Sequence, residues 1–475
     1  MSQLDSATPV PYNSLTPKLR TLLTEKNDRF LLRIIRANFN TQYASQAPSL
    51  AAFHNVVVAY GIEVDNTLLQ DFRSHVALMD YASYKPFVAK FDEWPCKESE
   101  IENLFAPGLP FSLVWSSTTS GNAPKMFAKY HHIAKEAPIH RSVYDRSDVN
   151  GQENWVIYYG YKELKEIEHK SGEGQLGGTL TATRVGLPGQ AVPWAASLIT
   201  RHQSFLIIHA LFCLVCQDLE RLATTFAPVF MDIMRHVDNE WDMLLTCIRD
   251  GTIPDLEGID NVRAHLQVHL HANSGRATEL REIGPPFSCA GWATCVWPKM
   301  RMLVAVGSGP YVFVLPKVRS VLGPTIAIRS HGYGATESVF AACYEDHLDT
   351  FVLQTEDVIE FLDATAEENH QNILQPWDLE ADTIEHMHYA GSKSHFARQK
   401  LFEALDATNI AHRRALDNGR IRLPTIRIVK PGTFMEYHQQ KGKKLKFGAG
   451  QIKVPVVLSE SACKEWLEER VVEEL

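Results

Sequence analysis

Residues 325–338 read TIAIRSHGYGATES, an apolar run followed at once by a polar segment with two glycines. The run at residues 325–330 is typical of a buried strand, and α/β proteins place ligand-binding residues just after such strands. The segment Tyr333-Gly334-Ala335-Thr336-Glu337 offers an aromatic face for a purine, a hydroxyl for a phosphate and a carboxylate for Mg²⁺. The plain alternative is a turn with a solvated glutamate. The pattern predicts an α/β protein with a candidate nucleotide site at this strand end.

Helical and strand-like patterns alternate along most of the chain, which indicates an α/β fold rather than an all-β one. Apolar residues at helical spacing predict helices at residues 15–44, 158–168, 195–222 and 226–249, the last ending at Gly251. A long charged helix is expected at residues 394–409. Short apolar runs predict strands at residues 112–116, 179–185, 302–306, 325–330, 341–344, 351–353, 425–429, 446–447 and 454–458.

Chain length and a change in composition predict two domains. A chain of 475 residues exceeds what one hydrophobic core usually serves. Acidic and amide residues cluster at residues 367–382, and the chain beyond them is richer in lysine. We therefore expect a large mixed α/β N-terminal domain at residues 1–375 and a smaller, abbreviated α+β C-terminal domain at residues 376–475.

Charge and composition narrow the possible partners. The net charge of −9 argues against nucleic acid or an anionic membrane as the main partner. The first 17 residues lack the apolar core of a secretory signal, and the apolar run at residues 205–216 is too short to span a bilayer. The eight cysteines are scattered in a long chain, so a disulfide framework is not expected. We expect a cytoplasmic, reduced protein.

A second motif lies upstream, where a hydroxyl-rich loop follows the apolar run that ends at Trp115. It reads Ser116-Ser117-Thr118-Thr119-Ser120-Gly121-Asn122-Ala123-Pro124-Lys125. Backbone N–H groups, hydroxyls and one ammonium can together surround phosphate oxygens. A flexible surface loop is the alternative. In their order along the chain, with the hydroxyl-rich loop first and the Tyr333 segment second, the two motifs point to an enzyme that activates a carboxylic acid with ATP.

A third segment, Gly448-Ala449-Gly450-Gln451-Ile452-Lys453-Val454-Pro455, presents one lysine just before an expected strand. Such a lysine can stabilise the oxygens of a transferring phosphate, although an ordinary hairpin lysine is the simpler interpretation.

Three other patterns are interpreted as structural. Residues 172–177 match a dinucleotide-binding string, but the strand–loop–helix context is missing. Cys213 and Cys216 lie on one face of an apolar helix without a second pair, so we expect buried thiols rather than zinc ligands. His265 and His269 have helical ligand spacing without the glutamate of a zinc protease motif.

Together these residues resemble the GH3 family of acyl-acid amido synthetases, within the adenylate-forming superfamily. The resemblance covers most of the chain. Its further parts are Phe72-Arg73-x-x-Val76, Asp80-Tyr81-x-x-Tyr84-Lys85-Pro86-Phe87, Gly291-Trp292, Gly307-Ser308-Gly309, Ile359-Glu360-Phe361 and Pro431-Gly432-Thr433-Phe434.

The resemblance implies an ATP-dependent acid–amino acid ligase with an N-terminal adenylation domain, using ATP and Mg²⁺. A small carboxylic acid would attack the α-phosphate to form an acyl-adenylate, and an amino acid would then attack its carbonyl and release AMP. By resemblance, Ser116 to Gly121 and Lys125 hold phosphates, Tyr333 to Thr336 contact the nucleotide, Glu337 holds Mg²⁺, and Lys453 acts beside the α-phosphate. Glu337 and Lys453 would thus be the catalytic residues.

The chain departs from the family pattern in two places. Thr118 stands where the family loop usually has glycine, and no Gly-Asp dipeptide, whose aspartate would bind the ribose, occurs anywhere in the chain. The alternatives are therefore a catalytically impaired relative that binds an acid or nucleotide, an adenylate-forming ligase with coenzyme A as acceptor, and an incomplete transcript across residues 373–390.

Overall fold

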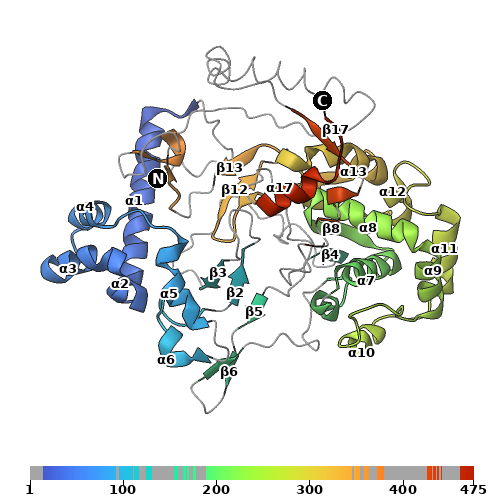
Figure 1. Cartoon of the computed structure of the whole chain (residues 1–475), viewed down its shortest axis with the longest axis horizontal. Helices are drawn as coiled ribbons and strands as arrows, with labels where there is room; N and C mark the ends of the chain where they lie inside the picture. The colour runs from blue at the N-terminus through green and yellow to red at the C-terminus, as the bar shows by residue number, and fades with distance from the viewer. Residues whose placement is uncertain are drawn as a thin grey trace.

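The computed structural model is shown in Figure 1. It describes residues 14–91, 96–110, 112–116, 125–130, 154–158, 164–166, 168–170, 175–177, 189–199, 201–344, 347–353, 358–362, 372–378, 425–430, 432–434, 436–437, 440 and 461–474.

The described chain begins with a group of helices, drawn in blue in Figure 1. Thr16 caps the first helix by accepting a hydrogen bond from the Leu19 amide at 3.2 Å. The helix expected at residues 15–44 is interrupted because Thr41 caps a new helix through the Ala44 amide, also at 3.2 Å. Apolar faces of these helices form a small core of their own. The helices are α1 (Pro17–Asn38), α2 (Gln42–Gln46), η2 (Pro48–Leu50), α3 (Ala51–Tyr60) and α4 (Asp65–His75).

A four-stranded parallel sheet lies at the centre of the larger core, and its strand order is β10-β9-β8-β4. Leu303, Val304 and Ala305 in the second of these strands are fully buried, because helices cover a parallel sheet on both faces. The expected α/β architecture is therefore confirmed. The strands are β4 (Asn154–Tyr158), β8 (Leu219–Phe226), β9 (Met302–Val306) and β10 (Ala327–Arg329).

Helices between these strands complete the core. The apolar run at residues 205–216 forms a buried helix as expected, and burial raises the pKa of the Cys213 thiol. Buried Arg276 joins three helices by donating to the carbonyls of Leu214 and Val296, both at 2.8 Å. Gly251 ends α9 in the left-handed conformation, with φ of 66°. The helices are α7 (His202–Val215), α8 (Ala227–Asn239), α9 (Trp241–Asp250), α10 (Arg263–Gln267), α11 (Ser274–Ile283), α12 (Trp292–Val296), η7 (Gly309–Val314) and α13 (Leu315–Leu322).

Small antiparallel sheets lie between the two helical groups in Figure 1. One has the strand order β3-β2-β5, and another the order β11-β12-β13. Short helices precede the first of these sheets. These elements are η3 (Tyr81–Ser83), α5 (Lys85–Val88), η4 (Ala89–Phe91), α6 (Glu98–Ile101), β2 (Ser112–Trp115), β3 (Met126–Lys129), β5 (Leu164–Glu166), β11 (Tyr333–Gly334), β12 (Val339–Cys343) and β13 (Phe351–Leu353).

The helix expected at residues 226–249 is divided at Glu240 into α8 and α9. Two further helix predictions are contradicted because part of each segment forms strands. The helix expected at residues 158–168 is replaced by the end of β4, by β5 and by the start of β6, because this segment pairs with a strand about fifty residues earlier, with Lys165 opposite Leu113. The helix expected at residues 195–222 ends at Val215, and β8 takes a central place in the parallel sheet. Cross-strand pairing overrode the local pattern in both cases.

The strands expected at residues 112–116, 302–306, 325–330, 341–344, 351–353 and 425–429 are confirmed with shifts of up to two residues at their ends. Those expected at residues 179–185, 446–447 and 454–458, and the helix at 394–409, lie outside the described residues. Gln175–Gly177 forms the antiparallel strand β7, which agrees with rejecting a dinucleotide motif there. The remaining elements are η6 (Trp194–Leu198), β1 (Cys96–Lys97), β6 (Glu168–Lys170), β14 (Phe361–Leu362), β15 (Ile373–Leu374) and η9 (Pro376–Asp378).

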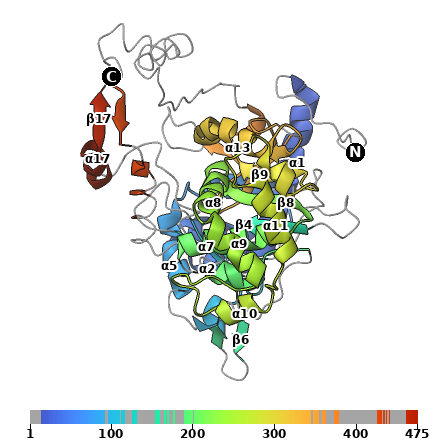
Figure 2. The same ribbon diagram turned by 90° about the vertical axis from the view of Figure 1, so that its right-hand side faces the viewer.

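The described C-terminal part contains β16 (Arg427–Val429), β17 (Val471–Glu474) and α17 (Ser461–Glu468). Figure 2 shows α17 and β17 to one side of the parallel sheet and its helices. Upstream, Asn27 donates to the side chain of Gln375 at 3.2 Å and Arg20 donates to the carbonyl of Trp377, so the segment around the expected domain boundary packs on α1. The boundary itself stays a prediction. None of the helices described here has the length and hydropathy to cross a membrane.

Candidate functional site

The hydroxyl-rich motif Ser116–Lys125 connects strands β2 and β3, which form an antiparallel hairpin. The Ser116 amide donates to the Lys125 carbonyl at 2.8 Å, and the Lys125 amide donates to the Ser116 hydroxyl at 3.0 Å. These two bonds close the neck of the loop. Ser117, Thr118, Thr119, Ser120 and Gly121 lie outside the described residues.

Tyr81 supports this neck from the helical side. Its hydroxyl donates to the Met126 carbonyl at 3.1 Å and accepts from the Met126 amide at 2.9 Å, and the Lys125 ammonium lies 5.5 Å from the centre of its ring. Asp80 holds Tyr81 in place by accepting from the Ala82 amide at 3.0 Å. The Asp80-Tyr81 pair quoted from the sequence therefore has a structural function, which is to fix the exit of the loop.

Tyr84 and Phe87, from the same sequence signature, pack beneath this region. The Tyr84 ring stacks on Tyr43 with centroids 5.0 Å apart, and burial raises the pKa of Tyr84 to about 12. Tyr43 also meets Phe87 edge to face at 5.0 Å. This aromatic cluster gives the hairpin a rigid base.

The Tyr333–Glu337 motif forms part of the hairpin of β11 and β12. The Ala335 amide donates to the Ser338 carbonyl at 2.8 Å and closes the turn. Gly332 precedes the hairpin with φ of 107°, and a Cβ atom there would lie 2.5 Å from the Ala341 carbonyl oxygen, so the position requires glycine. Gly334 is also tight, since its Cβ would lie 3.0 Å from the Ser338 oxygen.

The side chains of this hairpin are available to a ligand. Tyr333 is 59% exposed, and its ring contacts those of Phe340 and Phe351, with centroids 5.7 and 6.2 Å away. Ala335 and Glu337 are exposed and Thr336 is half-buried. An exposed carboxylate suits Mg²⁺ that takes its remaining ligands from phosphates and water. The described residues contain no group of three or more His, Cys, Asp and Glu side chains that could hold a metal by themselves.

His331 attaches the hairpin to the parallel sheet. Its Nε2 donates to the Thr224 carbonyl at 2.7 Å, near the carboxyl end of β8. Burial lowers the pKa of His331, and the hydrogen bond to Thr224 opposes that effect only in part. The hairpin thus begins at the carboxyl ends of parallel strands, as the sequence predicted.

Lys129 joins the two hairpins. Its ammonium, on β3, donates to the carbonyl of Thr336 and, at 3.1 Å, to that of Glu337. In Figure 1, β12 and β13 accordingly lie beside β2 and β3, between the two helical groups. The structure therefore brings the β2–β3 hairpin, which carries Ser116 and Lys125 at the neck of its loop, into contact with the Tyr333–Glu337 segment through Lys129. Lys453 lies outside the described residues.

Sequence reasoning missed Lys129, His331 and the support from Tyr81. A signal for Lys129 exists in the alternation Lys125, Phe127, Lys129, which puts these three residues on one face of β3, opposite the buried Met126. No comparable signal marks His331, because its partner is 107 residues away.

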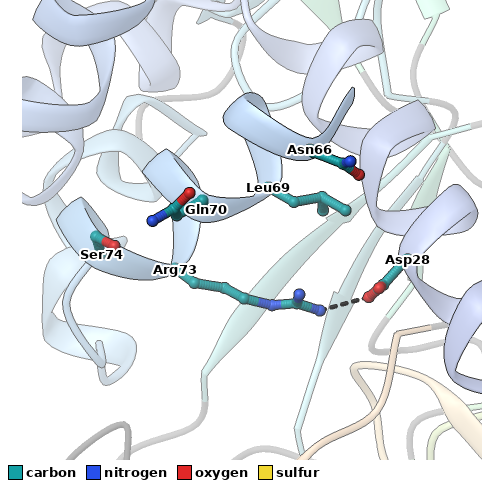
Figure 3. A pocket seen from close by; sticks show the side chains of 6 residues that line it. All are labelled: Asp28, Asn66, Leu69, Gln70, Arg73 and Ser74. Atoms are coloured by element: carbon teal, nitrogen blue, oxygen red, sulfur yellow. Dashed lines mark hydrogen bonds and ion pairs between the residues drawn. The ribbon is translucent and has the colours of Figure 1, made fainter. Parts of the chain in front are cut away.

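A separate cavity of about 330 Å³ lies between α1 and α4, as Figure 3 shows. An ion pair of 2.5 Å between Arg73 and Asp28 crosses it, and Phe72 packs edge to face on Phe53 nearby. Both side chains of the ion pair are partly exposed, and none of the residues from the two hairpins lines the cavity. We interpret it as a groove between packed helices. Its lining residues are Asp28, Asn66, Leu69, Gln70, Arg73 and Ser74.

Two family models match the chain: the GH3 family N-terminal domain at residues 18–326 and the GH3 family C-terminal domain at residues 347–462. A solved structure described as GH3.15 acyl acid amido synthetase aligns over 98% of each chain with a TM-score of 0.64 and 15% identity. A second, AtGH3.15 acyl acid amido synthetase in complex with 2,4-DB, aligns over 98% of each chain with a TM-score of 0.61 and 14% identity. At 14–15% sequence identity, these structural matches show similarity of fold only. A search of curated proteins found no match.

Proposed function

The chain belongs to the GH3 family, and from this premise we propose that it is an acid–amino acid ligase that uses Mg·ATP. Its substrates would be a small carboxylic acid and an amino acid, and its location the cytoplasm. The observation that supports the proposal is the contact between the two hairpins, in which Lys129 of the β2–β3 hairpin donates to the carbonyls of Thr336 and Glu337 in the other.

The nucleotide would lie across both hairpins. Tyr333 offers its exposed face to adenine, while the loop from Ser116 to Gly121 and the Lys125 ammonium would surround the phosphates. Thr336 would donate a hydroxyl to a phosphate oxygen. Glu337 would hold Mg²⁺, which neutralises charge on the triphosphate and so favours attack by the acid.

The first step needs no covalent bond to the protein. The carboxylate attacks the α-phosphorus, the bond to the bridging oxygen breaks, and pyrophosphate leaves. Lys453 would stabilise the negative charge on the α-phosphate oxygens as this happens. In the second step the amine attacks the acyl carbonyl and AMP leaves, provided that water is kept from the mixed anhydride.

Pyrophosphate release from Mg·ATP in the presence of a panel of small carboxylic acids tests the first step. The compound 2,4-DB, named with the second solved structure, is a suitable first member of the panel. AMP release that depends on an added amino acid would support amide ligation, whereas dependence on coenzyme A would support a thioester-forming ligase. Glu337→Gln is the matched inactive control.

A second candidate function is a catalytically impaired relative that binds an acid or a nucleotide. The specific observation in its favour is the absence of a Gly-Asp dipeptide, which removes the expected ribose ligand. Two lost hydrogen bonds to a charged group, at about 1.5–3 kcal/mol each, would weaken ATP use by roughly two to four powers of ten. Binding of Mg·ATP without pyrophosphate release for any acid would favour this function.

The mature transcript decides whether the protein lacks the Gly-Asp dipeptide. Sequencing the mature transcript across residues 373–390 would either reveal additional codons for a Gly-Asp segment or confirm the short join. Additional codons would strengthen the ligase proposal, and a confirmed join would favour the impaired relative.

A further inference from the structure

We propose that Lys129 is a positioning residue that holds the Tyr333–Glu337 hairpin against the hairpin of the phosphate loop, so that ATP meets both in one arrangement. This inference rests on the proposed function, because the positioning matters only if both hairpins contact the nucleotide. Lys129 belongs to none of the sequence motifs of the site.

The first support is the type of contact that Lys129 makes. Its ammonium is bonded to two successive backbone carbonyls, those of Thr336 and Glu337, which are 207 and 208 residues away in sequence. An ion pair with a carboxylate restrains only a side chain. Hydrogen bonds to two backbone carbonyls restrain the backbone itself. The side chain is also half-buried rather than solvated.

The second support is the effect of this contact on the turn. In a trans peptide the N–H group points opposite to the C=O group. Because both carbonyls point toward Lys129, the amides of Glu337 and Ser338 are directed to the other side of the turn. The ammonium thus sets the orientation of the two peptide units next to the proposed Mg²⁺ ligand.

The third support is the position of Lys129 along β3. The strand pairs Trp115 with Met126 at the loop end and Ser112 with Lys129 at the other. Three residues of an antiparallel strand span about 10 Å, so the anchor lies about that far from the neck of the loop. The strand therefore acts as a rigid spacer between the phosphate-type loop and the Tyr333 hairpin.

The test compares Lys129→Met, Lys129→Gln and Lys129→Arg with Lys90→Met in the full chain. Lys90 is a matched control because its ammonium is also half-buried, donates to the Gln42 side chain at 2.9 Å and lies 5.6 Å from the Phe87 ring, but touches neither hairpin. Hydrogen–deuterium exchange without ATP measures the anchoring directly. The KM for ATP and kcat for pyrophosphate release measure its consequence.

We expect Lys129→Met and Lys129→Gln to increase exchange in peptides covering residues 333–343 and to raise the KM for ATP by about tenfold or more. Since the residue does not touch the reacting atoms, kcat should change much less, and Lys129→Arg should restore part of the KM. Lys90→Met should match the wild type in both measurements.

Unchanged exchange at residues 333–343 in Lys129→Met would overturn the proposal. So would increased exchange with an unaltered KM, or a loss confined to kcat. If all three Lys129 variants fail to fold while Lys90→Met folds, the residue is a stability determinant and the proposal is wrong. If the wild type neither binds nor turns over ATP, the proposed function fails, and the exchange experiment still reports whether the anchor exists.

Discussion

His209, in the middle of helix α7, predicts a measurable dependence of stability on pH. The side chain is 1% exposed, its Nδ1 donates to the Phe205 carbonyl at 2.8 Å, and its ring lies 4.1 Å from the Phe205 ring. Burial disfavours the charged imidazolium and lowers the pKa to about 4, although the hydrogen bond to Phe205 acts in the opposite direction. The folded protein therefore holds this histidine neutral at pH values where the unfolded chain protonates it.

The sign and the size of the effect follow from the two pKa values. The pKa in the folded state is depressed below the unfolded value of about 6.5, so the stabilisation is complete above pH 6.5 and is lost as the pH falls toward 4. Integration between about pH 7.5 and pH 5 gives a loss of about 2 kcal/mol in the free energy of unfolding.

The variant His209→Leu removes the titrating group and keeps the site apolar. Urea unfolding followed by tryptophan emission is a suitable assay, because Trp292 and Trp297 are buried in the same core with ring centroids 5.5 Å apart. We expect the wild type to lose about 2 kcal/mol more than the variant between pH 7.5 and pH 5. His271→Asn, at an exposed position, is the control and should follow the wild type.

Equal losses in the wild type and in His209→Leu would refute the reasoning. That result would mean that the imidazole is protonated without cost inside α7, which is incompatible with its burial among apolar side chains.

Three further predictions concern the hairpin of β11 and β12 and the glycine that precedes it. Glu337→Gln should abolish pyrophosphate release while changing the unfolding free energy by less than about 0.5 kcal/mol, since the side chain is exposed, and unchanged turnover would remove Glu337 from the site. Tyr333→Ala should raise the KM for ATP by about 5- to 150-fold, which is the equivalent of about 1–3 kcal/mol of stacking. Tyr333→Phe keeps the ring and should stay close to the wild type. Equal KM values for the wild type and both variants would exclude stacking. Gly332→Ala should displace the hairpin, because the new Cβ would lie 2.5 Å from the Ala341 oxygen. Hydrogen–deuterium exchange at residues 333–343 should rise, while the core that contains Trp292 and Trp297 should unfold as in the wild type. An unaltered exchange pattern would contradict this.

Features of the fold with a local cause could be predicted from the sequence. The apolar runs that became β9 and β10 and the buried helix α7 were recognised from composition and length alone. Gly251 ends α9 where expected, because a left-handed terminal residue favours glycine in any tertiary context. The resemblance to the GH3 family rested on short motifs and was confirmed by the family models.

Features that depend on a distant partner were missed. The first half of strand β8, residues 219–222, was predicted as the end of a helix, yet the strand lies between β4 and β9, where parallel neighbours satisfy its backbone hydrogen bonds. The expected helix at residues 158–168 became strands because β5 pairs with β2 across a gap in sequence. Helical and strand patterns compete closely in short segments, and pairing over a long range decides between them.

The same distinction applies to the candidate site. The sequence alone determined the chemical groups, since Ser116, Lys125, Tyr333 and Glu337 stand in motifs that can be read without a structure. Only the tertiary structure decided that these motifs are neighbours, through Lys129, whose hydrogen-bond partners are 207 and 208 residues away. A hydrogen bond depends on distance and angle in space, and the local pattern on which sequence reasoning relies contains neither.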